Sequence, residues 1–422
     1  MSTAVLGAER SGRVAETTER AHLLARRFLP LVIGSYLLFR LLSAVLMIWL
    51  ARHQVPEGVP FGPESGSTTT YWDMTRMWDG RWYETIVNEG YPDQLPVQDG
   101  ALQQNQWAFY PLFPELTRLL MSITGLPFGV VGSMLSLVLG TAAAGVMGVL
   151  IRDKVGPAVA LAAVCVYAAS PPSPTLQMAY TESLAMLLLC GFLLAVQREQ
   201  WAVAATLALL TGLTRPIALP LGLVALVVVV LRWRDRSERP ISRRDWGGML
   251  STLVACGLAG LMWPAIAWSQ TGSPTAYTDT MGTWRVGGEV HAFQPWWHNS
   301  AVALGDFWGR FWLLAFVVAM LVAMLGPWAR GLGAPMRTWT LGYLLYLGAV
   351  LDPWTSIYRY LLFVFPLAVV MVGGGWAPDD ERSRVYRFVG LRTVVLVLLG
   401  LGWQVWWGWE LLRFIPPADN PI

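Results

Sequence analysis

The sequence predicts an all-α, polytopic membrane protein, and two features carry that prediction. Of the 422 residues, 55% are hydrophobic and only 14% are charged, whereas soluble domains contain roughly 25% charged residues. Apolar runs that approach the length of about 20 residues needed to cross a bilayer core recur along most of the chain. We therefore expect about eleven membrane-spanning helices.

The apolar runs cover residues 31–50, 130–151, 158–169, 184–196, 201–213, 217–231, 249–268, 311–325, 341–351, 360–372 and 389–409. The first run follows about 30 polar residues and lacks a small-residue cleavage site, so it is expected to be a retained helix. Together the runs define a transmembrane domain over residues 31–409. A cytoplasmic segment, residues 1–30, precedes it, and a tail, residues 410–422, follows it.

Arginine is distributed unevenly between the segments that connect these runs. If the N-terminus is cytoplasmic, the inner segments contain 20 of the 30 cations, including the basic run over residues 232–244. This bias is the one that the positive-inside rule predicts. The basic run contains no nucleic-acid motif, so it is interpreted as a topology determinant beside anionic lipid, and no nucleic-acid partner is expected.

The same topology places two long loops, residues 51–128 and 270–302, outside the membrane. A loop as long as the first is usually functional, and its many aromatic residues are atypical of a disordered linker. Within the segment WDGRWYETIVNEG, Trp82/Ile86 and Tyr83/Val87 are spaced as helical i,i+4 pairs, and Gly90 can end that helix. The pattern predicts a short amphipathic helix along the outer membrane surface.

An enzyme on the outer face lacks cytoplasmic nucleotides, so a transferase there must take its activated group from a lipid-borne phosphate. Such a reaction requires a carboxylate that accepts a proton from the acceptor hydroxyl and cations that stabilise the departing phosphate. Aromatic surfaces would hold a sugar and an isoprenoid tail. The outer segments supply all three residue types.

Several short motifs resemble one family. The sequence MWDGRWYETIVNEGY at residues 77–91 is followed by QWAFYPLFP at residues 106–114. YTESL at residues 180–184, the pair Arg359-Tyr360 and the pair Phe365-Pro366 come later in the chain. In this order they resemble the PIG-V family of mannosyltransferases, which has bacterial relatives and belongs to the GT-C superfamily of polytopic transferases that use polyprenyl-phosphate sugars.

The resemblance implies an inverting transfer of mannose from a polyprenyl-phosphate donor to a glycolipid, glycan or protein on the outer side of the membrane. It implies that Asp79 is the general base; Asp73 is the competing base, and Asp79 as a simple helix cap is the alternative. Glu182 is expected to bind acceptor hydroxyls as a second catalytic acid, although a carboxylate at a helix start is also favoured by the dipole. The substrate-binding candidates are Asp73, Trp78, Arg81, Trp82, Tyr83, Tyr110, Tyr180, Arg215, Arg285, Arg359 and Tyr360. For Arg215, Arg285 and Arg359 the alternative is a snorkelling or structural role, but at least one of them is expected to meet the lipid phosphate.

No cofactor or metal is expected. The three cysteines lie inside predicted spans, and His291 and His298 lack the spacing of zinc ligands. A transporter or lipid-sugar flippase is the alternative function, but such proteins place ionisable groups deep within spans. Here the acidic residues cluster in the outer loops, and Arg40 is the main cation inside an apolar run. An interaction scaffold would not explain the acidic and aromatic first loop.

Overall fold

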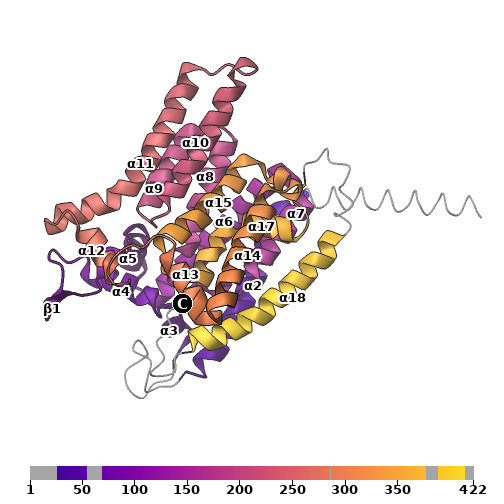
Figure 1. Cartoon of the computed structure of the whole chain (residues 1–422). Coiled ribbons are helices and arrows are strands. Elements are labelled where there is room, and N and C mark those ends of the chain that lie inside the picture. Colours follow the sequence, from indigo (N-terminus) through magenta and orange to yellow (C-terminus); the bar gives the residue numbers. More distant parts are fainter. Residues whose placement is uncertain (1–25, 55–68, 286, 377–387, 414–422) are drawn as a thin grey trace, which may run out of the picture.

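A computed structural model describes residues 26–54, 69–285, 287–376 and 388–413 of the chain. The described residues are mostly helical, and their strands form one short antiparallel pair, β1 (Val97–Gln98) and β2 (Ala101–Leu102) (Figure 1). The predicted all-α class is therefore confirmed. Most of the predicted N-terminal segment, part of the first loop and residues 414–422 of the predicted tail lie outside the described residues.

All but one of the predicted apolar runs coincide with a continuous helix. These helices are α2 (Phe28–Ala51), α6 (Phe128–Val155), α7 (Pro157–Ala168), α8 (Glu182–Gln197), α9 (Trp201–Gly212), α10 (Ala218–Arg234), α11 (Arg243–Thr271), α14 (Asp306–Leu325), α15 (Gly333–Val350) and α18 (Val389–Trp407), which continues as the π-helical turn η7 (Gly408–Leu412). By length and composition, α2, α6, α11, α14 and the α18–η7 helix are long and apolar enough to cross a membrane.

The predicted single span over residues 360–372 is wrong. This segment is broken into α16 (Ile357–Tyr360), the 3-10 turn η5 (Leu361–Val364) and α17 (Pro366–Met371). Pro366 has no backbone N–H and stands at the first turn of α17, where proline is tolerated, so a new helix begins there. The break leaves Arg359 on a short helix, and its side chain is buried.

The remaining elements connect these helices. They are α3 (Tyr71–Thr75), α4 (Asp79–Glu89), η1 (Gln106–Ala108), α5 (Leu112–Thr124), η2 (Ser173–Gln177), η3 (Asp235–Ser237), α12 (Ala276–Gly282), α13 (Gln294–Leu304) and η4 (Pro327–Leu332). Figure 1 shows α3, α4, α5 and α12 gathered at one end of the bundle, while the connection between α10 and α11 projects from the opposite end. The aromatic first loop and the basic run are thus on opposite ends.

The predicted amphipathic helix corresponds to α4, which ends at Gly90 with a φ of 82°. A positive φ of this kind is readily adopted only by glycine. Tyr83, Ile86 and Val87 are buried in a cluster with Phe113 of α5 and with residues of α6 and α8. The apolar face of α4 therefore packs against protein.

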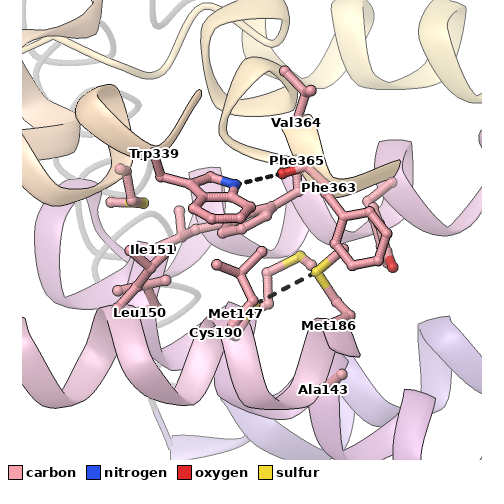
Figure 2. Close-up of a cluster of buried hydrophobic side chains, with 14 of the residues drawn as sticks. Ala143, Met147, Leu150, Ile151, Met186, Cys190, Trp339, Phe363, Val364 and Phe365 are labelled. Carbon is pink, nitrogen blue, oxygen red and sulfur yellow. Dashed lines mark hydrogen bonds between the residues drawn. The ribbon is translucent and has the colours of Figure 1, made fainter. Parts of the chain in front are cut away.

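The core forms where α6 and α8 meet α7 and α15. Figure 2 shows one part of it, in which the Trp339 indole donates a hydrogen bond of 2.7 Å to the Phe363 carbonyl. Small residues on α6 allow the close approach of neighbouring helices. At Gly140, for example, an added Cβ would clash with the Tyr36 hydroxyl of α2. Close packing of α2, α6 and α8 therefore requires glycine at this position.

The segment that joins α7 to α8, residues 169–181, is largely buried although much of it is not helical. Irregular backbone at membrane depth is tolerated only where protein groups satisfy its polar atoms. Ser133 and Ser136 of α6 donate to the carbonyls of Gln177 and Tyr180 at 2.7 and 3.2 Å. Gln404 of α18 donates to the Ser170 carbonyl at 3.2 Å.

Arg40 of α2 holds the start of the same segment. Its guanidinium donates to the Ser173 carbonyl and, at 2.6 Å, to the Ala168 carbonyl at the end of α7. A cation is favourable there because the carbonyls at a helix C-terminus lack partners within the helix. Arg40 therefore has a structural role, and the fixed segment delivers Thr181 and Glu182 to the start of α8.

The sidedness of the bundle is tested by labelling single cysteines in intact cells. Gln98 lies in the first loop and Ser237 in the basic run, and both side chains are exposed. From the arginine distribution we expect Gln98→Cys to react with an impermeant thiol reagent and Ser237→Cys to remain unlabelled. The opposite pattern would reverse the topology; the wild type, whose cysteines are buried or half-buried, serves as the background.

Candidate active site

Four charged side chains from distant parts of the sequence form one continuous chain of ion pairs. Arg359 Nη1 lies 2.6 Å from Asp79 Oδ2 and 2.9 Å from Glu182 Oε1. Arg215 Nη1 lies 2.7 Å from the same Glu182 oxygen. The order is Asp79, Arg359, Glu182, Arg215, so the cluster contains two cations and two anions and is electrically balanced.

Helix ends bring these groups together. Asp79 and Glu182 are the first residues of α4 and α8, where the helix dipole favours a negative charge. The consecutive helices α8 and α9 pack against each other, and Arg215 lies just after α9, before Pro216 and the start of α10. The α8–α9 hairpin therefore carries Glu182 and Arg215 at the same end.

The four side chains differ in exposure. The Glu182 and Arg359 side chains are 1% and 4% exposed, and that of Arg215 is 10% exposed. Asp79 is 25% exposed, the most of the four. Burial of single charges would be very unfavourable, but paired and hydrogen-bonded charges can be accommodated. Asp79 is thus the carboxylate of the cluster that a ligand can reach most easily.

Aromatic rings cover the two arginines. Arg215 lies over the rings of Tyr360 and Phe363 at 5.1 and 5.3 Å, and Arg359 lies over Tyr180 at 5.1 Å. Burial lowers the pKa of Arg359, but the nearby Asp79 and Glu182 carboxylates outweigh it and raise the pKa well above its usual value. For Arg215, burial likewise lowers the pKa, but the nearby Glu182 carboxylate outweighs burial and raises the pKa above its usual value. Both arginines are therefore charged.

The turn before Asp79 is strained. Trp78 has a φ of 54° and a ψ of −116°, a combination that is unusual for a bulky residue and often marks a functional site. The Trp78 side chain is buried with Tyr180, whose hydroxyl donates to the Met77 carbonyl at 2.8 Å. A Cβ at Gly80 would lie 3.2 Å from the Thr75 carbonyl oxygen. Tight packing on both sides thus fixes the position of Asp79.

A cavity of about 730 Å³ adjoins the ion-pair chain. Asp79 and Arg215 line it, whereas Glu182 and Arg359 do not. Arg285 also lines the cavity and donates a long hydrogen bond of 3.4 Å to the Val350 carbonyl. Six tyrosines form much of the wall: Tyr83, Tyr110, Tyr277, Tyr343, Tyr346 and Tyr360. The cavity therefore combines three acidic residues, Asp79, Asp279 and Glu289, with two arginines and many aromatic faces.

Several of the other predicted site residues do not line this cavity. Asp73 caps α3 instead, accepting hydrogen bonds from Thr70 and pairing with Arg76 at 3.2 Å. Arg81 lies on the exposed face of α4. Trp82 stacks on Phe109 with a centroid distance of 5.5 Å. Trp78 and Tyr180 are buried in one cluster, and Tyr180 donates to the Met77 carbonyl in the turn before Asp79.

No sequence pattern distinguishes Tyr277, Tyr343 or Tyr346 as a site residue. The Tyr277 hydroxyl accepts a hydrogen bond of 3.1 Å from Tyr110, which joins α12 to the first loop. Tyr343 and Tyr346 have i,i+3 spacing on α15, and that spacing is equally typical of core packing. Thr181 was also missed as a contact residue: its hydroxyl lies 3.3 Å from Arg215 and 3.2 Å from the Tyr83 hydroxyl.

A second cavity, of about 420 Å³, shares the α16–η5 segment with the first. Tyr360 lines the first cavity, while Tyr358 and Leu361 line the second. The walls of the second cavity are mainly apolar side chains of α7, α14, α17 and α18. Within the described ranges, no cluster of three or more His, Cys, Asp or Glu side chains is arranged to hold a metal.

No family model and no curated protein matches this sequence. Among solved structures, ArnT from Cupriavidus metallidurans bound to undecaprenyl phosphate is similar with a TM-score of 0.48 and 16% identity, over 85% of this chain and 63% of that one. The archaeal oligosaccharyltransferase AglB from Archaeoglobus fulgidus has a TM-score of 0.49 and 12% identity, over 92% and 56%. The mycobacterial arabinofuranosyltransferase AftD has a TM-score of 0.42 and 18% identity, over 90% and 28%. This chain spans less than two thirds of each.

Proposed function

We propose that this protein is a membrane glycosyltransferase of the GT-C type. It transfers a hexose from a polyprenyl-phosphate donor to an acceptor hydroxyl on the outer face of the membrane. The motif resemblance to the PIG-V family favours mannose as that hexose. The observation that carries the proposal is the cavity that Asp79 and Arg215 line together with six tyrosines. A proton acceptor, a phosphate-binding cation and sugar-stacking surfaces are the groups that this reaction needs.

In the proposed reaction the acceptor oxygen attacks the anomeric carbon of the sugar from the face opposite the phosphate. The bond between that carbon and the phosphate oxygen breaks, and the electron pair leaves with the polyprenyl phosphate. Asp79 accepts the proton of the acceptor hydroxyl. The exposure of Asp79 to the cavity supports this role, while the position of Asp73 in the α3 cap supports a structural role for that residue.

The two arginines at the cavity wall are proposed to bind the departing phosphate. Arg215 and Arg285 both line the cavity, and a guanidinium presents a planar set of donors that suits phosphate oxygens. Arg359 is less suited to this contact because it is buried between two carboxylates and does not line the cavity. The apolar second cavity next to α16 supports a donor with a hydrocarbon tail.

The first experiment supplies the purified protein in lipid vesicles with labelled polyprenyl-phosphate-mannose and candidate acceptors. We expect label to move covalently from the donor to a glycolipid, glycan or protein, and transfer should survive strong chelation because arginines neutralise the leaving phosphate. Movement of intact donor across the bilayer without covalent transfer would instead identify a flippase. Loss of transfer with EDTA and its rescue by manganese or magnesium would recast the carboxylates as metal ligands.

A pair of isosteric substitutions tests the base. A general base contributes typically about 10²- to 10⁴-fold to a rate, so Asp79→Asn should lower transfer by about that factor. Asp73→Asn is the matched control: it lies in the same loop, can still cap a helix, and should change transfer much less. Activity of Asp79→Asn within about threefold of the wild type would remove Asp79 from the catalytic role.

A further inference from the structure

Glu182 is placed to act on other protein groups. Its side chain is 1% exposed and does not line the cavity. One oxygen, Oε1, accepts from both Arg215 at 2.7 Å and Arg359 at 2.9 Å. The other oxygen, Oε2, has no hydrogen-bond partner among the residues that the structure describes. Glu182 Oε1 is thus shared between Arg215, which lines the cavity, and Arg359, which also pairs with Asp79.

The pairing of Asp79 with Arg359 opposes the proposed role of Asp79. Asp79 Oδ2 accepts a hydrogen bond from Arg359, so the proton of an acceptor hydroxyl must compete with Arg359 for this oxygen. The contact is short, at 2.6 Å, and Arg359 is itself nearly fully buried. The strength of this restraint depends on how much of the Arg359 charge is already neutralised by Glu182, which in turn depends on Arg215.

We propose that Glu182 is a positioning residue that couples phosphate binding at Arg215 to the release of Asp79 from Arg359. The inference rests on the proposed function. Without ligand, Glu182 is shared between Arg215 and Arg359. A donor phosphate in the cavity competes with Glu182 for Arg215, so the Glu182 charge falls more fully on Arg359. Arg359 then holds Asp79 less strongly, and the base becomes effective when the donor is bound.

The coupling has a direct consequence for specificity. While Asp79 is paired, its Oδ2 atom is occupied by Arg359 and is less accessible to water or to an acceptor that arrives before the donor. A bound phosphate supplies the negative charge that rearranges the ion pairs. A ligand can shift such an equilibrium only by binding one of the two arrangements more tightly than the other. All contacts in the relay are between neighbouring charges, so no movement of a helix is required.

Glu182→Gln tests the relay, because glutamine keeps the shape and removes the charge. We expect kcat to fall by about tenfold or more, in the range of typical couplings between sites, since Arg359 then pairs with Asp79 alone. The Kd of polyprenyl phosphate, measured without turnover, should be unchanged or lower because Arg215 has lost its counter-ion. The sharper test adds Arg359→Gln: the double variant should recover part of the lost kcat, because the restraint on Asp79 is gone.

If Glu182→Gln does not fold, the charge-balanced double variant Glu182→Gln/Arg359→Gln is compared with the single variant Arg359→Gln. Adding Glu182→Gln to Arg359→Gln should then change kcat little. A raised KM for the acceptor with near-normal kcat would show that Glu182 contacts the acceptor and would overturn the relay. So would a double variant with a kcat no higher than that of foldable Glu182→Gln. Normal wild-type transfer with either result overturns this inference alone, whereas no transfer by the wild type overturns the proposed function as well.

Discussion

The guanidinium of Arg359 lies between two carboxylates, and the rest of the site depends on this contact. Asp79 lies 280 residues and Glu182 lies 177 residues before Arg359 in the sequence, so the three residues meet only in the folded bundle. Because each charge is buried or half-buried, none is favourable alone, but the four-membered chain that includes Arg215 is balanced. Folding of the first loop onto the bundle therefore brings Asp79 to the one position where its partner is fixed.

Arg359 is held in place because the polar atoms of the irregular backbone around the site find hydrogen-bond partners inside the bundle. The segment before Glu182 is held by Arg40 and by serines of α6, and the Trp339 indole donates to the Phe363 carbonyl of η5, directly after α16. Breaks of this kind are tolerated within a membrane only where they are enclosed by protein or line a cavity. The structural Arg40 and the cavity-lining Arg215 are thus two different solutions for arginine in an apolar bundle.

Much of the fold follows from sequence patterns, because long apolar runs have few alternatives to the helix in a membrane. Hydropathy could not predict the break around residues 357–371, since its residues are as apolar as those of a span and only Pro366 signals it. Motifs identified Asp79, Glu182 and Arg359 singly, and Arg215 was a candidate because arginine is costly near a membrane boundary. Their pairing could not be predicted, because helix packing decides which helix ends meet. The tyrosines on α12 and α15 that line the first cavity could not be predicted either, because helix packing also decides which side chains face the cavity.

A double-mutant cycle on the thermal unfolding of Asp79→Asn, Arg359→Gln and their combination tests the ion-pair chain most directly. Residues in contact within one charge network show interaction free energies of about 0.5–3 kcal/mol. We predict that the second substitution destabilises the protein clearly less than it does alone, so that the two effects are not additive. Additive effects would contradict the account, because Asp79 would then be positioned without its contact to Arg359.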